Sequence, residues 1–287
     1  MEQFPRTSVE GISLSRMVIG TNWILGWSHT SPAADTMIRT NHATVESICP
    51  MLETFMEHGV DTIMAPFGSS DVLVNAVHET EDRTGRGMVM IDTPVVNVDD
   101  NADARREAEQ TIRKSREAGA KICLLHHYCA EQLVNKNKHK IERLEDYTRM
   151  IRDAGMVPGL SAHMPELIVY SDENEYDVQT YIQIYNCMGF MMQVEIETVN
   201  QIIQNAKKPV MTIKPMAAGR TTPYIGLTFS WNAIRDQDMV TVGAHTPDEA
   251  EEDIEISFAA LEHRFPNLEK RSSPVQDQAA FGEVKER

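Results

Sequence analysis

The sequence has few cysteines, few aromatic residues and no long apolar run. Its cysteines, Cys49, Cys123, Cys129 and Cys187, lie in apolar segments without Cys-x-x-Cys spacing, which indicates buried thiols in a reducing compartment. No window approaches the roughly 18 apolar residues of a membrane-spanning helix. The N-terminal segment MEQFPRTSVEGISLS has no apolar stretch typical of a signal peptide. We therefore expect a cytoplasmic protein that does not enter a membrane.

Positive charge is also scarce. The 287 residues contain 27 Lys and Arg against 43 Asp and Glu, a net charge of −16. Such a chain repels a polyanion, so nucleic acid is a poor candidate partner and a small-molecule substrate is the expected one. The 41% hydrophobic content is enough for one large core or two modest ones, and the 24% of charged residues excludes disorder over most of the chain.

Short β-rich runs alternate with longer amphipathic segments along almost the whole chain. The expected strands are 16–21, 60–64, 88–93, 120–126, 157–161, 181–185, 209–214 and 239–243. Expected helices between them include 45–58, 103–118, 141–154, 194–206 and 247–265.

This alternation predicts the fold class. Gly59, Gly119 and Gly155 each follow a helical pattern and directly precede a strand, as helix C-caps do. Parallel strands with such short connections close most simply into a single α/β (β/α)8 TIM barrel over residues 1–271, followed by a flexible tail over 272–287. A doubly wound open sheet is the rival, but the sequence contains no Gly-x-Gly-x-x-Gly turn.

Six short segments resemble the aldo-keto reductases in order and spacing, over about residues 10 to 265. They are Gly11–Thr21, Gly59–Ile63, Gly159–Ser161, Gln183–Asn186, Lys214–Gly219 and Gly243–Asp253. The resemblance implies a barrel of aldo-keto reductase type that begins with a short N-terminal hairpin.

The resemblance fails at the residues that carry reduction in that family. Its members use an Asp, a Tyr, a Lys and a His, and alignment places Met64, Phe67 and Pro94 at the first three positions. Only the histidine is kept, as His126. Because a phenylalanine has no proton to give to a carbonyl oxygen, we expect standard aldehyde reduction to be absent.

The expected cofactor site is altered as well. Where the family commonly holds the 2′-phosphate of NADP with basic residues, this chain has His245, Asp248, Glu249, Glu251, Glu252 and Asp253. Carboxylates would repel that phosphate, so NAD(P) is the less favoured cofactor. Ser161, Gln183 and Asn186 are retained, and they are either a nicotinamide site or polar caps of their strands.

Histidines at the predicted strand ends are the candidate catalytic groups. We expect alternation to point His126 into the barrel mouth and His127 away from it, and His163 to follow the fifth strand. Asp92 should share the interior face with Pro94. One alternative is a divalent metal site formed by Asp92, His126 and His163, although no local signature such as His-Glu-x-x-His supports it.

Lys214 ends the seventh predicted strand. A lysine there can form a Schiff base with a carbonyl substrate or anchor an anionic group. Arg220 follows closely and suits an anion. The loop 23–32 contains Trp27 and His29, and it is either a lid over the substrate or part of the rim. His127 and Tyr185 complete the set of candidate substrate-binding residues.

The first functional hypothesis is an enzyme that acts on a small polar carbonyl or carbohydrate-like compound. The chemistry would be acid/base or metal-assisted, as in a lyase, isomerase or hydrolase. The alternatives are an NAD(P)-dependent oxidoreductase with an unusual catalytic set, and a barrel that binds a ligand without catalysis. Fold alone does not choose between them.

Overall fold

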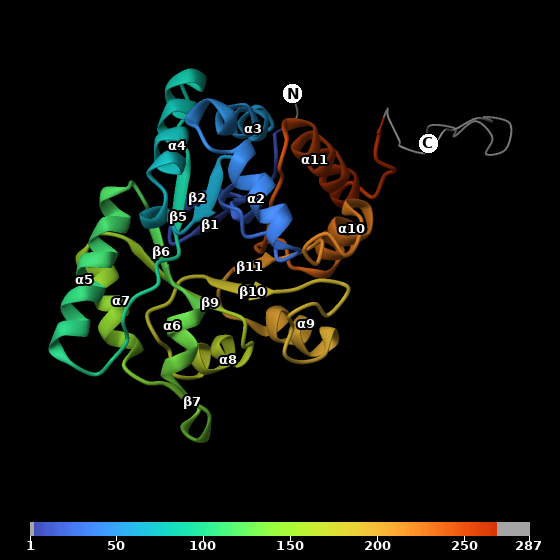
Figure 1. Ribbon diagram of the computed structural model, residues 1–287. Coiled ribbons are helices and arrows are strands. Elements are labelled where there is room, and N and C mark those ends of the chain that lie inside the picture. Colours follow the sequence, from blue (N-terminus) through green and yellow to red (C-terminus); the bar gives the residue numbers. More distant parts are fainter. Residues whose placement is uncertain (1–2, 269–287) are drawn as a thin grey trace, which may run out of the picture.

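The computed structural model describes residues 3–268, and eight parallel strands close into a barrel (Figure 1). Around the barrel the order is β3 (Met17–Gly20), β4 (Thr62–Ala65), β5 (Val89–Asp92), β6 (Ile122–Leu125), β9 (Val157–Ala162), β10 (Tyr181–Ile184), β11 (Val210–Ile213) and β12 (Met239–Val242). Each predicted strand overlaps one of these, so the expected (β/α)8 barrel is confirmed.

Helices follow the strands and form an outer layer. The main ones are α3 (Val45–Glu57), α4 (Asp71–Thr84), α5 (Ala102–Glu117), α7 (Leu144–Asp153), α8 (Glu166–Glu173), α9 (Ile196–Asn205), α10 (Pro223–Ala233) and α11 (Pro247–Leu261). The helices predicted from the sequence correspond to α3, α5, α7, α9 and α11. Among the described residues, no helix is long and apolar enough to cross a membrane.

Shorter elements complete the fold. An antiparallel hairpin of β1 (Arg6–Val9) and β2 (Ile12–Ser15) precedes the barrel. Val9 and Leu14 of this hairpin pack with the side chains inside the barrel, so the hairpin covers one end of it. The remaining elements are α1 (Asn22–Leu25), α2 (Pro32–Asn41), η1 (Phe67–Ser69), α6 (His127–Ala130), η2 (Glu131–Leu133), β7 (Val134–Asn135), η3 (Lys136–Lys138) and β8 (Lys140–Ile141).

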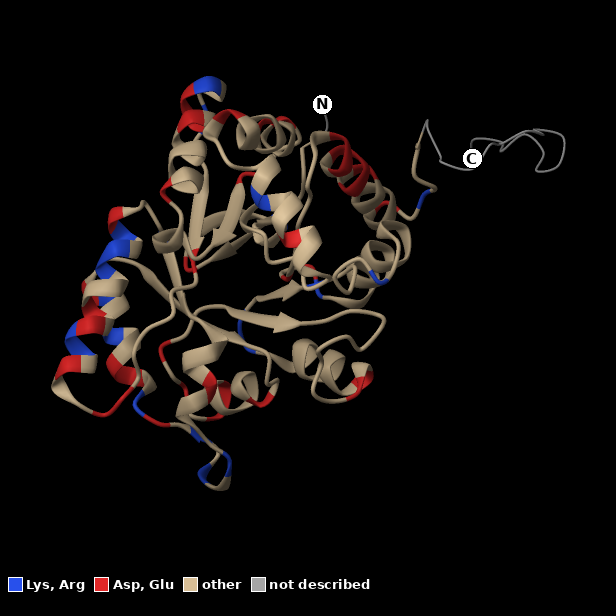
Figure 2. Cartoon of the chain, in the orientation of Figure 1, with Lys and Arg blue, Asp and Glu red and all other residues tan. Residues whose placement is uncertain are grey.

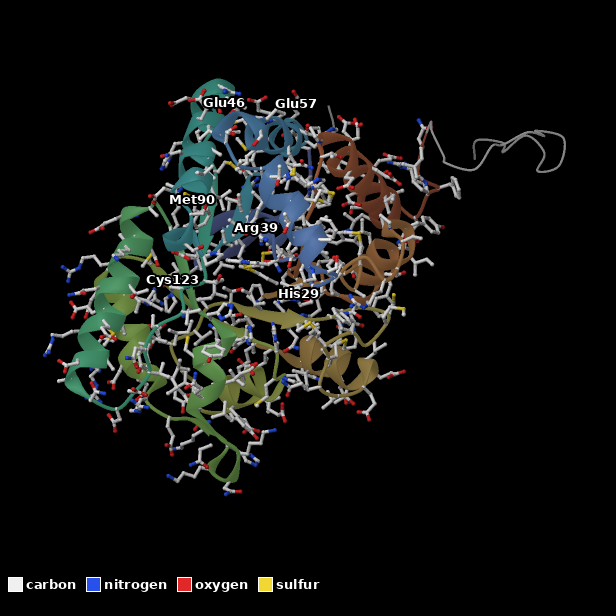
Figure 3. All side chains as sticks on the ribbon, viewed as in Figure 1. His29, Arg39, Glu46, Glu57, Met90 and Cys123 are labelled. Atoms are coloured by element: carbon white, nitrogen blue, oxygen red, sulfur yellow. The ribbon has the colours of Figure 1, made fainter. Side chains whose placement is uncertain are left out.

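Strand alternation divides the core into two layers. Side chains that fill the barrel include Val18, Val89, Ile91, Ile122, Leu124, Ile182, Met211 and Met239. The neighbouring residues on the same strands, such as Met90 and Cys123, pack between the barrel and the helices (Figure 3). Each fully buried aliphatic side chain contributes about 1.5–3 kcal/mol. The interior is therefore a packed core, and space for a ligand is found beyond the carboxyl ends of the strands.

Capping side chains fix where two helices begin after the mouth loops. Thr222 accepts a hydrogen bond from Ile225 N at the start of α10, and Thr246 accepts one from Glu249 N at the start of α11. Such N-caps contribute about 1 kcal/mol each and define the ends of the preceding loops. The tail predicted over 272–287 lies outside the described residues.

Candidate active site

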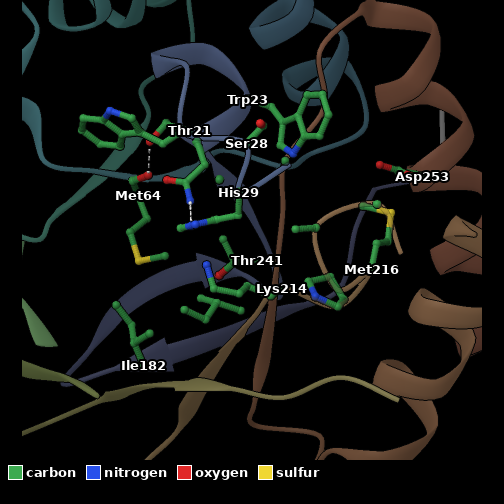
Figure 4. A pocket seen from close by; sticks show the side chains of 18 of the residues that line it. Thr21, Trp23, Ser28, His29, Met64, Ile182, Lys214, Met216, Thr241 and Asp253 are labelled. Carbon is green, nitrogen blue, oxygen red and sulfur yellow. Dashed lines mark hydrogen bonds between the residues drawn. The ribbon is translucent and has the colours of Figure 1, made fainter. Parts of the chain in front are cut away.

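A cavity of about 1130 Å³ opens at the carboxyl ends of the strands. Every strand contributes a lining residue, and each of these except Ile182 lies in the last two positions of its strand or one or two residues after it. These residues are Gly20, Met64, Thr93, His126, Ser161, Ile182, Lys214 and Thr241. The cavity therefore occupies the barrel mouth, the position at which enzymes of this architecture carry their active sites. Figure 4 shows part of it.

His126 directly follows β6 and lines the cavity, as expected. Its Nδ1 accepts a hydrogen bond of 3.2 Å from Tyr128 N at the start of α6. Because Nδ1 is an acceptor, the proton of the neutral ring is on Nε2. Burial, with His127 close by, lowers the pKa of His126 to about 4. At neutral pH His126 is thus an uncharged ring with an N–H donor left for a ligand.

Three histidine rings form a continuous row at the mouth. The His126 and His127 ring centroids are 4.3 Å apart, and His127 stacks on His163 at 3.5 Å with an interplanar angle of 15°. All three line the cavity. The expectation that His127 points away is wrong, because His127 is the first residue of α6 and no longer follows strand alternation. Burial, reinforced by His127 and Lys214, lowers the pKa of His163 to about 3.

Glu131 holds the loop that carries His163. Its Oε1 accepts hydrogen bonds from His163 N at 2.7 Å and Met164 N at 2.8 Å. On the other side, Gln183 Nε2 donates to the His163 carbonyl at 3.4 Å. Sequence analysis missed Glu131, because its partners lie more than 30 positions away and no local pattern marks the contact.

Lys214 reaches the cavity through an unusual backbone conformation. Ile213, the last residue of β11, faces the interior, so regular alternation would send the next side chain outward. Lys214 instead has φ 62°, in the left-handed region, and its side chain lines the cavity (Figure 4). A non-glycine residue there costs roughly 1–3 kcal/mol, and such strain is concentrated at functional sites.

The ammonium group of Lys214 is buried without a carboxylate partner among the described residues. Burial lowers the pKa of Lys214 to about 8, and no nearby carboxylate opposes this effect among the described residues. The charge of Lys214 in turn helps to lower the pKa values of His29, His127 and His163. Lys214 and the histidine row therefore share one electrostatic environment.

Arg220, Trp27 and His29 line the outer part of the cavity. The Arg220 guanidinium lies 3.8 Å from the centroid of the Phe190 ring and donates to the carbonyl oxygens of Ala217 and His29. Trp27 is 43% exposed. All three were expected to bind substrate, and that role stays a prediction.

Four predicted site residues do not line the cavity: Asp92, Tyr185, Gln183 and Asn186. Tyr185 packs outward on Phe229, and its hydroxyl accepts a hydrogen bond from Asn200. Gln183 donates to backbone carbonyls, and Asn186 bonds backbone groups of its own loop. Gln183 of β10 and Asn186 of the loop that follows it therefore make hydrogen bonds within the fold.

Asp92 faces the helices, contrary to the expectation that it shares the interior with the histidines. Oδ1 accepts a hydrogen bond of 3.1 Å from Phe67 N. Burial raises the pKa of Asp92 to about 6, although Ser115 of α5 and backbone groups bond to the carboxylate. Ile91 and Thr93, on either side of it, are the inward residues. Asp92, His126 and His163 do not converge, and no group of three His, Cys, Asp or Glu in residues 3–268 lies close enough to hold a metal ion.

The structure also places the positions aligned with the reductase tetrad. Met64 and His126 line the cavity, whereas Phe67 is buried in the outer layer and Pro94 is not among the lining residues. The mouth thus presents no tyrosine at the position expected for a proton donor.

Solved structures with the same fold include aldo-keto reductases. One neighbour, a Pseudomonas aeruginosa protein assigned to that family, superposes with a TM-score of 0.65 over 91% of this chain and 97% of its own, at 12% identity. An aldose reductase from Giardia lamblia gives a TM-score of 0.52 over 93% and 90%, at 11% identity. No family model matches the sequence, and no curated protein matches it. At these identities the likeness establishes the barrel fold of aldo-keto reductase type.

Proposed function

We propose that this barrel is an enzyme that acts on a small carbonyl compound through a Schiff base at Lys214, as a lyase or isomerase. The observation that carries the proposal is the state of Lys214. Its side chain lines the cavity, its backbone is strained, and burial lowers its pKa to about 8 without a carboxylate partner. About a tenth of such a lysine is the neutral, nucleophilic amine at pH 7, against well below 0.1% for an ordinary lysine.

Formation of the imine follows from the groups present. The Lys214 Nζ lone pair forms a bond to the carbonyl carbon, and the C=O π electrons move onto oxygen. The two amine protons are transferred to that oxygen, which leaves as water. His126 is the candidate donor to the carbonyl oxygen, because its proton is on Nε2. His127 and His163 are neutral rings at the same mouth and are candidates to carry the protons between nitrogen and oxygen.

Protonation of the imine then creates an electron sink. When the adjacent carbon loses a proton, the C–H electron pair forms a C=C bond, the C=N π electrons move onto nitrogen, and an enamine results. Reprotonation of that carbon on its opposite face, followed by hydrolysis of the imine by water, completes an isomerisation. If the next carbon carries a hydroxyl group, the enamine instead expels it: the C–O electron pair leaves with the oxygen, which takes up a proton and departs as water, and hydrolysis of the remaining imine completes a lyase reaction. A neutral imidazole such as His127 suits the proton transfer, because it can accept a proton without first losing one.

An oxidoreductase that uses NAD(P) is the weaker candidate. Ser161 does line the cavity, which favours it. However, Gln183 and Asn186 bond within the fold, and the part of the mouth formed by α11 carries Glu249, Glu252 and Asp253. Those carboxyl groups oppose a phosphate.

The test is exchange of α-protons in D₂O, followed by NMR, with hydroxyacetone, dihydroxyacetone and pyruvate as probes. The wild type should exchange at least one probe faster than buffer does. Lys214→Met and Lys214→Arg should show only the buffer rate, because neither can form an imine. Lys138→Met removes an exposed lysine paired with Glu142 and should match the wild type. Exchange that persists in Lys214→Met, or a wild type that exchanges none of the probes, contradicts the proposal.

A further inference from the structure

The cavity has an acidic wall that the Schiff base chemistry does not use. Glu249, Glu252 and Asp253 of α11 all line it, and their spacing of three and four residues places them on one face of the helix. Figure 2 shows the concentration of Asp and Glu on α11. In Figure 4, Asp253 lies on the right beside Met216, while His29 and Lys214 lie near the centre.

Only one of the three carboxyl groups is explained by the fold. Glu249 Oε2 accepts a hydrogen bond of 2.7 Å from His245 N, next to the start of α11. Asp253 is 3% exposed, and within residues 3–268 its carboxyl group has no hydrogen bond or ion pair. A buried carboxyl without a partner is costly. A side chain of this kind, turned toward a cavity, points to a partner supplied by a ligand.

The surroundings of Asp253 define what that partner is. Burial, reinforced by the carboxylates of Glu249 and Glu252, raises the pKa of Asp253 well above the usual range. The three carboxyl groups do not form a group that could hold a metal ion in the described part of the chain. An organic cation can be bound by one or two carboxyl groups and does not require three that meet at one point.

We propose that this acidic wall binds a primary ammonium group of the substrate, so that the enzyme acts on amino-bearing carbonyl compounds. The ammonium would take the place of the missing partner of Asp253 and would be attracted by Glu252. Trp23 of α1 also lines the cavity, and Figure 4 shows it between Ser28 and Asp253. An indole face beside a cation adds a further attraction. The inference that the substrate also carries a carbonyl group rests on the proposed function. The inference of an ammonium site does not.

The experiment compares two probes of equal length that lack a carbonyl group and so cannot react with Lys214. 5-Amino-1-pentanol carries an ammonium group where 1,5-pentanediol carries a hydroxyl. Their affinities for the full-length protein are measured by ligand-observed NMR titration at pH 7.5. We expect the amine to bind at least about tenfold more tightly, as charge-assisted hydrogen bonds predict. The preference should also persist in Lys214→Met.

Variants on α11 locate the site. Asp253→Asn and Glu252→Gln should each reduce the preference for the amine by about fivefold or more. Glu252 is exposed, so its variant is not expected to disturb folding. Glu251→Gln is the matched control, because it removes one negative charge from the same helix at a side chain that faces His58. Its preference should stay within twofold of the wild type.

Equal binding of the two probes would overturn the ammonium site, and so would a preference that survives the double variant Asp253→Asn/Glu252→Gln. Failure of the α-proton exchange with an intact amine preference would reject the Schiff base alone. Failure of the amine preference with intact exchange would reject the substrate class alone.

Discussion

Replacement of Lys214 by methionine should stabilise the protein while it removes activity. The pKa of Lys214 is lowered from 10.5 to about 8 by burial alone. At about 1.4 kcal/mol for each tenfold change in the equilibrium, this corresponds to about 3 kcal/mol by which the folded state disfavours the ammonium. Methionine has a similar length and no charge, so Lys214→Met should gain up to about 3 kcal/mol at pH 7.

The gain should depend on pH in a defined direction. Below pH 8 the lysine is protonated in both states, and the folded wild type carries the full cost. Between pH 8 and 10.5 the unfolded state binds more protons than the folded state, so the stability of the wild type rises with pH. The advantage of Lys214→Met should therefore be largest at and below neutral pH and should shrink as the pH approaches 10.5.

Urea denaturation at pH 7 and at pH 10 measures this difference. The midpoint of Lys214→Met should be higher than that of the wild type at pH 7, with an unchanged slope. Lys138→Met, at an exposed position, should change stability by less than about 0.5 kcal/mol. A methionine variant that is less stable at pH 7, or a gain that is equal at both pH values, would refute the reasoning about Lys214.

Further predictions concern the surrounding residues. His126→Asn should lower kcat by about 10²–10⁴-fold while circular dichroism stays unchanged, because the asparagine oxygen can still cap Tyr128 N; a wild-type kcat would exclude His126 as the donor. Glu131→Ala leaves two backbone N–H groups without an acceptor. The variant should lose about 1–3 kcal/mol of stability, measured by thermal unfolding. Because the loop that carries His163 is then no longer held in place, kcat should also fall. NADPH should bind weakly or not at all by calorimetry, and Glu252→Arg should improve binding of NADPH more than of NADH. Tight binding of NADPH to the wild type would contradict the assignment of the acidic wall. NADPH-dependent reduction of an aldehyde panel should be absent, and turnover typical of reductases would show that another group replaces the missing tyrosine.

The positions of the strands could be predicted because each β-rich run is bounded by glycine or by a change in periodicity. This was sufficient to locate His126 and Lys214 at the carboxyl ends of β6 and β11. It was harder to predict whether each strand side chain points into the barrel or toward the helices. Asp92 lies on the outer face of β5, because the inward series there is Val89, Ile91 and then Thr93 just after the strand.

Other features depend on geometry that local sequence does not encode. His127 is the first residue of α6, and only His126 separates this helix from the end of β6, so strand alternation no longer applies. Lys214 faces the cavity because of a left-handed φ that its side chain does not favour. The backbone there is held by packing of α10, whose Gly226 would place a Cβ only 2.6 Å from the Pro215 carbonyl oxygen. Contacts of this kind join segments that are distant in the chain.

Trapping of the imine tests the central claim most directly. The wild type, Lys214→Met and Lys138→Met are incubated with hydroxyacetone, dihydroxyacetone and an aminoketone, treated with sodium borohydride, and measured by intact-protein mass spectrometry and peptide mapping. Reduction fixes an imine as a stable secondary amine. The account predicts a single adduct on the peptide that contains Lys214, in the wild type and in Lys138→Met. No such adduct should form in Lys214→Met. Labelling of surface lysines alone, or an equal mass gain in Lys214→Met, would contradict it.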